Sequence, residues 1–187
     1  MAITFRSGLC LTLVLVLLAH ATPGRAETVS FASGSYIVPT DTTYQDNGML
    51  LAYGMVYRLL RDGVPVEWVI EPTKAHLGND FTASAVDHVS RAVILAHGYR
   101  GGPFVIHAAD VARARPIVDA WQALHPAVTV HEATVSFDAF VARHLVAAPT
   151  IATFADGNEP IAFGYMNAAG IPDSAGRAWP GGRVSCP

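Results

Sequence analysis

The strongest constraint on the fold of this chain is a strand, a helix and a second strand that follow one another within residues 35–70. The segments Ser35–Pro39 and Val64–Ile70 are short and apolar, as buried strands are. Between them, apolar side chains recur at helical spacing up to Arg61, and Gly63 is a residue that commonly ends a helix. Such a unit is typically a right-handed crossover between parallel strands. The sequence therefore predicts a parallel sheet.

The rest of the chain continues this alternation of strands and helices. Short apolar runs predict further strands at residues 92–96, 104–106, 127–131 and 150–155. Helical spacing predicts further helices at residues 81–91, 108–124, 137–146 and 161–169. We therefore expect an α/β fold: an open, mostly parallel, doubly wound sheet of about five strands, either flavodoxin-like or amidotransferase-like, with helices on both faces.

The N-terminal segment predicts export. Residues 9–21 are almost unbroken apolar sequence, and Arg6 is the only charged side chain before them. This run is shorter than the roughly 20 residues of a membrane-spanning helix. It is typical of a signal peptide, with cleavage after Ala26 or after Ala21. We therefore expect a periplasmic or extracellular protein with no membrane span after cleavage.

The composition excludes several classes of protein. Hydrophobic residues make up 51% of the 187 residues and charged residues 14%, with 12 Lys and Arg against 15 Asp and Glu. This balance excludes a disordered polar chain, a coiled coil and a basic nucleic-acid binder. The chain divides into four expected parts: a signal peptide (1–26), a flexible lead-in (27–34), a single α/β domain (35–172) and an irregular tail (173–187).

Several catalytic signatures are absent from the sequence. It contains no GxGxxG, no Walker A lysine, no CxxC and no HExxH, so we expect no cofactor and assign no metal ligands. His97-Gly98 after an apolar run is similar to the oxyanion strand of α/β-hydrolases, but no Gly-x-Ser-x-Gly elbow accompanies it. Asp41 follows a strand as a phosphatase nucleophile does, but that chemistry needs a second aspartate where Thr43 stands. A helix cap is the better interpretation of Asp41.

Polar residues that follow the predicted strands form the candidate ligand-binding edge. In open α/β sheets, ligands bind beyond the carboxyl ends of the strands, where loops distant in sequence meet. The residues that we expect to converge there are Asp41, Thr43, Glu71, His107 and His131. The competing interpretation is a solvated edge without a site, because any α/β domain carries polar residues at its strand ends.

A resemblance to a known group of proteins adds to this interpretation. The run Tyr36–Asp46, with the segments 99–106, 148–158 and 168–174, resembles the N-terminal part of a family of uncharacterised exported bacterial proteins. That family continues past the position of Pro187, which implies that this chain is part of a longer protein. The order of elements is also similar to class I glutamine-amidotransferase-like domains, although their nucleophilic cysteine is absent.

These observations predict an exported α/β domain without catalytic activity. We expect it to bind a small molecule at the candidate edge or to form part of a larger secreted protein, with no nucleic-acid partner. One alternative is a hydrolase that uses an aspartate or a histidine of that edge, with or without a metal. The other alternative is a truncated fragment without activity.

Overall fold

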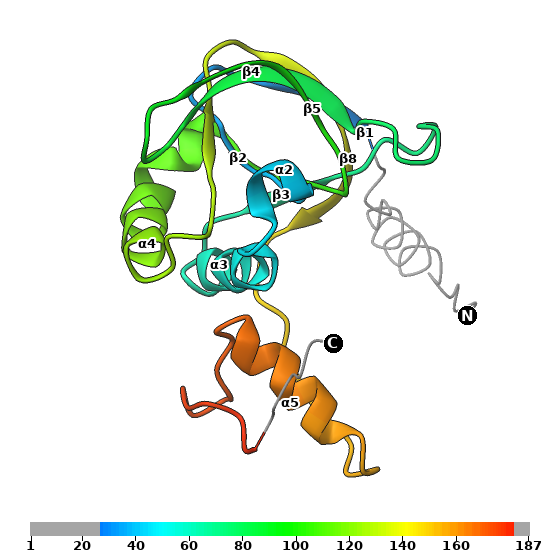
Figure 1. The fold of residues 1–187 in the computed structure, drawn as a ribbon, viewed down its shortest axis with the longest axis vertical. Helices are drawn as coiled ribbons and strands as arrows, with labels where there is room; N and C mark the ends of the chain where they lie inside the picture. Colours follow the sequence, from blue (N-terminus) through cyan, green and yellow to red (C-terminus); the bar gives the residue numbers. More distant parts are fainter. Residues whose placement is uncertain (1–26, 182–187) are drawn as a thin grey trace, which may run out of the picture.

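The computed structural model describes residues 27–181, which contain one eight-stranded sheet (Figure 1). Its strands are β1 (Glu27–Phe31), β2 (Tyr36–Val38), β3 (Val66–Val69), β4 (Phe81–Asp87), β5 (Val93–Tyr99), β6 (Phe104–Ile106), β7 (His131–Ala133) and β8 (Phe137–Leu145). The order across the sheet is β1-β8-β3-β6-β2-β7-β4-β5, and each neighbouring pair is antiparallel. The sheet curls into a half-barrel, so that β4 contacts β8 although four strands separate them in the order (Figure 1).

The predicted parallel, doubly wound, flavodoxin-like sheet is wrong. The helix α3 (Met49–Arg61) does connect β2 to β3, as the sequence indicates. Both strands pair antiparallel with β6, which lies between them, so they run in the same direction without being neighbours. The strand–helix–strand unit therefore skips one strand and makes no parallel pair.

Two segments predicted as helices are strands. Side chains of β4 alternate between the core and the surface at its start, with Phe81, Ala83 and Ala85 buried. The first part of β8 alternates in the same way. A repeat of two residues matches a strand, and burial on one face of the sheet outweighs the helix propensity of alanine. The predicted strand at residues 150–155 is irregular in the structure.

The sheet is buried on both faces by two apolar clusters. The outer cluster lies between the sheet and the helices α3 and α4 (Val111–Leu124), and includes Tyr36, Met55 and Val118. The inner cluster fills the curl of the sheet with aromatic rings, among which Phe81 stacks on Phe137 at 4.8 Å. Its remaining members larger than alanine are Phe31, Ile37, Val69, Tyr99, Val105 and Val141.

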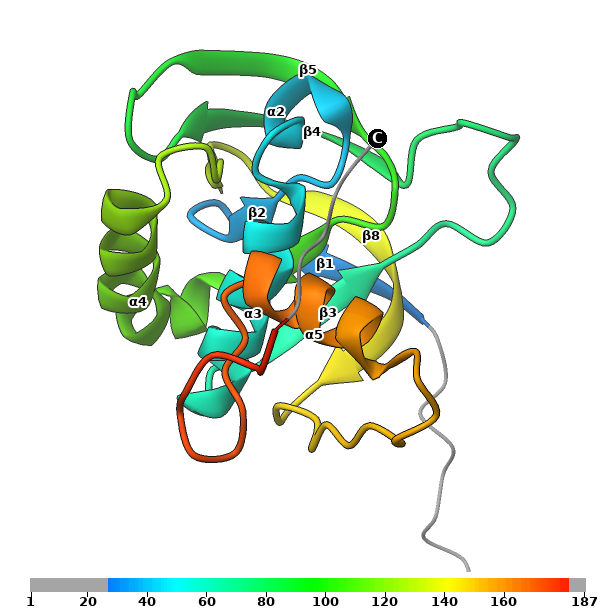
Figure 2. The same cartoon turned by 60° about the horizontal axis from the view of Figure 1, so that its bottom comes forward.

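Helix α5 (Glu159–Ala168) lies outside the half-barrel, where it packs on α3 (Figure 2). The approach is so close that a Cβ atom added to Gly54 would lie 1.6 Å from the carbonyl oxygen of Ala169. Residues 173–181 contain no helix or strand, but Trp179 anchors them: its backbone N–H and carbonyl oxygen bond to the side chain of Asn167, and its indole N–H donates to the carbonyl oxygen of Ile171. The C-terminal part is thus held against the domain by one helix and one tryptophan.

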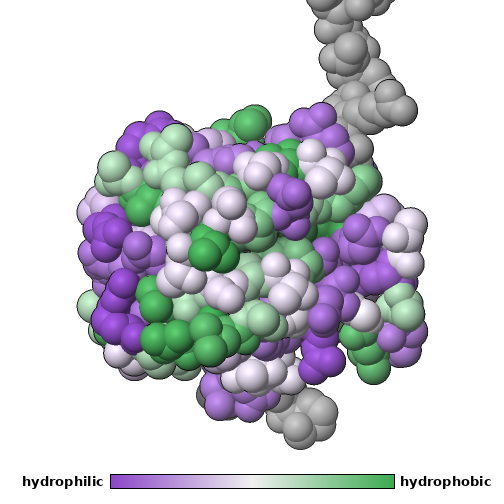
Figure 3. Space-filling model, turned by 90° about the horizontal axis from the view of Figure 1, so that it is seen from above, coloured by the Kyte–Doolittle hydropathy of each residue, from purple (hydrophilic) through white to green (hydrophobic). Residues whose placement is uncertain are grey.

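The two ends of the chain differ from expectation or lie outside the described residues. The predicted lead-in, residues 27–34, contains β1, which pairs with β8 along its whole length. The predicted signal peptide and Cys186 lie outside the described residues. None of the helices within residues 27–181 has the length and apolar character needed to cross a bilayer. Figure 3, which faces β4 and β5, shows polar side chains interspersed with apolar ones, and Val93 and Leu95 of β5 are exposed.

Candidate functional site

Asp41 lies where β2 gives way to the short helix α2 (Thr42–Gln45). It is the N-cap of this helix, since its Oδ1 accepts the backbone N–H of Thr43 at 3.1 Å. Its other oxygen, Oδ2, lies 3.1 Å from Nε2 of His97 on β5. The side chain of Asp41 is only 1% exposed and that of His97 is 19% exposed. The predicted cap is therefore also one half of a nearly buried carboxylate–imidazole pair.

An aromatic cluster continues from this pair into the curled sheet. The ring of Tyr44 meets His97 edge-on at 4.8 Å and His131 edge-on at 4.5 Å. The hydroxyl of Tyr99 lies 2.8 Å from Nδ1 of His131. We call these five residues, Asp41, Tyr44, His97, Tyr99 and His131, the Asp41 cluster. It joins α2 to β5 and β7, which lie on either side of β4.

Burial sets the charge states of His131 and Tyr99, the two fully buried residues of this cluster. His131 is inaccessible to solvent, and burial lowers its pKa to about 4. Burial also raises the pKa of Tyr99 above its ordinary value. At neutral pH His131 is therefore uncharged, and its Nδ1 shares a hydrogen bond with the neutral hydroxyl of Tyr99. Within residues 27–181, Nε2 of His131 has no hydrogen-bond partner.

A depression of about 390 Å³ lies on the other side of Asp41. Three segments that are distant in sequence supply its lining, which consists of Thr40, Asp41, Thr42, Lys74, Leu77, Gly78, Arg100 and Gly101. Thr40 joins two of these segments, since its hydroxyl donates to the carbonyl oxygen of Arg100 at 3.0 Å. The depression is thus formed by the end of β2, the loop after β3 and the turn after β5.

A buried carboxylate, Asp80, fixes two walls of this depression. Its Oδ1 accepts the backbone N–H of Glu71 at 2.9 Å and the ammonium of Lys74 at 2.5 Å. Its Oδ2 accepts the backbone N–H of Gly102 at 3.0 Å. The side chain of Asp80 has no exposed area. The loop and the turn are therefore held to one another whether or not a ligand is present.

The predicted site residues occupy three places. Asp41 and His131 belong to the Asp41 cluster, where Tyr44 lies between them. Thr43 is exposed on α2 and reaches the cluster only through its backbone bond to Asp41. Glu71 lies in the loop after β3, next to the depression but outside its lining. Its carboxylate accepts the hydroxyl and the N–H of Thr73, and these bonds lower its pKa.

His107 has different neighbours. It follows β6, stacks on Phe31 at 4.7 Å and places Nε2 3.4 Å from the carboxylate of Glu67. His144 of β8 reaches the other oxygen of Glu67 at 2.7 Å, so the two imidazoles lie at opposite ends of a buried carboxylate. Because the sheet is antiparallel, the strand-end argument for bringing all five residues together no longer applies. Their convergence stays a prediction.

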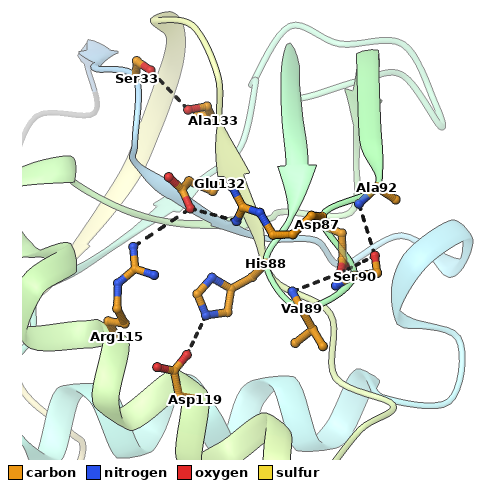
Figure 4. A network of polar contacts seen from close by, with 11 residues as sticks. Ser33, Asp87, His88, Val89, Ser90, Ala92, Arg115, Asp119, Glu132 and Ala133 are labelled. Atoms are coloured by element: carbon orange, nitrogen blue, oxygen red, sulfur yellow. Dashed lines mark hydrogen bonds and ion pairs between the residues drawn. The ribbon is translucent and has the colours of Figure 1, made fainter.

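A separate polar network ties the β4–β5 hairpin to α4 (Figure 4). Nε2 of His88 lies 2.6 Å from Asp119 of α4, while Glu132 of β7 pairs with Arg91 at 3.2 Å. Asp87 accepts the N–H groups of Val89 and Ser90 and so closes the hairpin turn. Each of these contacts joins neighbouring elements, and we assign the network to the stability of the fold.

Sequence reasoning considered His97 only for its likeness to an oxyanion strand and placed neither it nor Tyr99, Asp80 or Arg100 in the candidate site. No period of two marks β5 in the sequence, since its buried residues Ile94 and Tyr99 are five positions apart and its pairing with β4 is irregular between Ala83 and Ala85. Nothing local indicates that His97 reaches Asp41, because that contact depends on the curl of the sheet. Nor do residues 27–181 contain a group of three or more His, Cys, Asp or Glu side chains placed to hold a metal ion.

Comparisons with known proteins add no relative to this description. Neither a protein-family model, nor a curated protein, nor a solved structure matches the chain.

Proposed function

We propose that this chain is a ligand-binding domain that takes a small polar molecule into the depression beside Asp41. The observation that carries the proposal is Asp80, which bonds to both the loop and the turn that form the walls. A site that is held open in advance loses less conformational entropy when a ligand binds. A concave surface with a few converging polar groups is also the usual form of a small-molecule site.

The arrangement favours binding over catalysis. Both oxygens of Asp41 are engaged, one by the N–H of Thr43 and the other by His97, and the side chain is shielded from solvent. A nucleophile needs a free, exposed atom within reach of a base. Thr42, the exposed hydroxyl residue of the lining, has no hydrogen bond to a histidine within residues 27–181.

A ligand screen with the full chain tests this proposal. We expect a small polar compound to raise the unfolding temperature and to shift the amide resonances of Gly78 and Gly101, which line the depression. Replacing Thr42 by Tyr should fill the depression and abolish the response. The matched control is Thr150→Tyr, since Thr150 is exposed and lies outside the lining. Shifts that spare both glycines would contradict the proposal.

The second candidate function is hydrolysis, and one observation favours it. The His97–Asp41 pair has the form of an oriented general base, with an imidazole held at 3.1 Å by a shielded carboxylate. Turnover of ester or phosphoester substrates that disappears in His97→Gln would support it. Turnover unchanged in His97→Gln would exclude His97 as the base.

Export completes the proposed role. The support for it is the apolar run of residues 9–21 behind Arg6. We propose that the mature chain begins at Glu27 or at Thr22 and acts outside the cytoplasm, alone or within a larger secreted protein. N-terminal sequencing of the secreted form checks this, and a secreted chain that begins at Met1 would refute cleavage.

A further inference from the structure

The charged groups around the depression differ in how accessible they are. Two carboxylates, Asp41 and Asp80, lie at or behind its lining, with side chains that are 1% and 0% exposed. All four of their oxygens are occupied: those of Asp41 by Thr43 and His97, and those of Asp80 by the donors described above. Because both side chains are buried and already hydrogen-bonded, neither carboxylate presents an exposed oxygen to a ligand.

The two cations of the depression remain accessible. Lys74 is 23% exposed and directs one of its three N–H groups to Asp80, which leaves two donors. Arg100 is exposed, and within residues 27–181 its guanidinium has no ion-pair partner or acceptor. The nearby carboxylate of Glu71 lies outside the lining and is engaged by Thr73. A ligand in the depression would thus meet cationic donors and no free carboxylate.

The lining also offers an apolar surface. Leu77 is 71% exposed and its φ of 60° lies in the left-handed region, which is costly for a branched side chain. It projects from the loop beside Lys74 and lines the depression with it. A volume of about 390 Å³ is several times that of a single phosphate or carboxylate group. The site therefore has room for an anionic head and an apolar body.

We infer that the ligand of this depression is a small organic anion whose carboxylate or phosphate group is held by Arg100 and Lys74 and whose apolar part contacts Leu77. The inference rests on the proposed binding function and names the ligand class for it. A guanidinium binds both kinds of oxyanion through two parallel hydrogen bonds, while an ammonium acts as a point charge beside it. Both groups are already in place at the depression.

Titration of the full chain with four probes, followed through the amide resonances of Gly78 and Gly101, tests this inference. Benzoate and phenyl phosphate share an aromatic body with the uncharged benzyl alcohol, and inorganic phosphate lacks that body. We expect the two organic anions to bind, with the tighter one identifying the head group. We also expect phosphate to bind more weakly and benzyl alcohol not to bind.

Two variants distinguish specific binding in the depression from nonspecific attraction of anions to the positive charges of the protein. Arg100→Gln should weaken binding of the preferred anion about tenfold, the size of one charge-assisted contact. Arg143→Gln is the matched control, because Arg143 is exposed on β8 and outside the lining. Lys74→Gln is a second variant, although it also removes a partner of Asp80. Arg100 has no such structural role.

The outcomes of these experiments separate the inference that the ligand is an anion from the proposal that the depression binds a ligand. Binding of benzyl alcohol at the same glycines, without the anions, would overturn the inference and leave the binding proposal intact. Equal weakening by Arg100→Gln and Arg143→Gln would overturn the inference as nonspecific attraction. No binding by any of the four probes would overturn the anion inference, whereas a failure of the wider screen would overturn the proposed function itself.

Discussion

The hydroxyl of Tyr99 and Nδ1 of His131 lie 2.8 Å apart inside the half-barrel, and neither side chain is exposed to solvent. Tyr99 belongs to β5 and His131 to β7, and β4 lies between these strands in the sheet. The hydrogen bond therefore crosses over β4, the strand with which both β5 and β7 pair. It links the edge strand β5 to β7, two strands further in, through side chains and without backbone hydrogen bonds.

Replacing Tyr99 by Phe should destabilise the fold by about 1–3 kcal/mol, because the buried Nδ1 of His131 would lose its hydrogen-bond partner while the ring at position 99 is kept. Urea unfolding at neutral pH measures the change. Tyr165→Phe is the control, since Tyr165 is 48% exposed on α5. Equal stabilities for the two variants would show that the Tyr99–His131 bond contributes nothing.

Acidification should destabilise the protein through His131. Burial lowers its pKa in the folded state to about 4, whereas the unfolded chain has the ordinary value of 6.5. Between these values the unfolded state binds a proton that the folded state does not, so stability falls as the pH falls. The stability that depends on an uncharged His131 is fully present above pH 6.5. Lowering the pH to 4 removes about 3 kcal/mol from the free energy of unfolding.

Urea unfolding at several pH values checks this, with His131→Gln for comparison. The variant has no imidazole at this position, so its stability should fall less steeply between pH 6.5 and pH 4. The histidine resonances give a second readout, since one buried imidazole should remain uncharged at pH 5. Parallel stability curves for the two proteins would exclude His131 as the group responsible.

Replacing Asp80 by Asn should loosen the walls of the depression. The amide can accept through only one oxygen, so one of the three donors Glu71, Lys74 and Gly102 loses its partner along with the charge. We expect a loss of about 2–4 kcal/mol and faster hydrogen exchange at the Glu71 and Gly102 amides. Asp138→Asn, at an exposed position of β8, should change neither. Unchanged exchange at both amides would mean that Asp80 does not fix the walls.

The strands at residues 81–87 and 137–145 show why the fold class could not be obtained from local patterns. Both segments carry two alanines, which favour a helix, but their first residues alternate between buried and exposed positions. Interpreted as helices, they completed a regular strand–helix alternation and implied parallel pairing. Interpreted as strands, they supply a partner on each side: β4 pairs with β7, and β8 pairs with β3. Assigning a helical repeat to these two segments, where the structure has a repeat of two residues, thus led to a parallel sheet being predicted in place of an antiparallel one.

The candidate site was predictable to the extent that it depends on local chemistry. Asp41 follows a strand and precedes a helix, so the cap could be inferred from the sequence. His97 has no such local signal, since its contact with Asp41 joins residues 56 positions apart. The same holds for Asp80 and Gly102, whose bond spans 22 positions. The first contact depends on the curl of the sheet, and the second on the pairing of β4 with β5, which brings Phe81 opposite Tyr99; local sequence patterns encode neither.

Because α5 packs closely on α3, replacing Gly54 by Ala should change the stability in the direction opposite to that in an isolated helix. In an unconstrained helix, replacing Gly54 by Ala stabilises by about 1 kcal/mol, because alanine has the higher helix propensity. Here the new Cβ would lie 1.6 Å from the carbonyl oxygen of Ala169 and 2.9 Å from the ring of Trp121, so α3 and the end of α5 must move apart. We therefore expect Gly54→Ala to destabilise the protein and to speed proteolysis within residues 146–158, which connect β8 to α5. Urea unfolding and limited proteolysis measure the two effects. A more stable variant with unchanged cleavage would mean that α5 does not pack on α3 at Gly54.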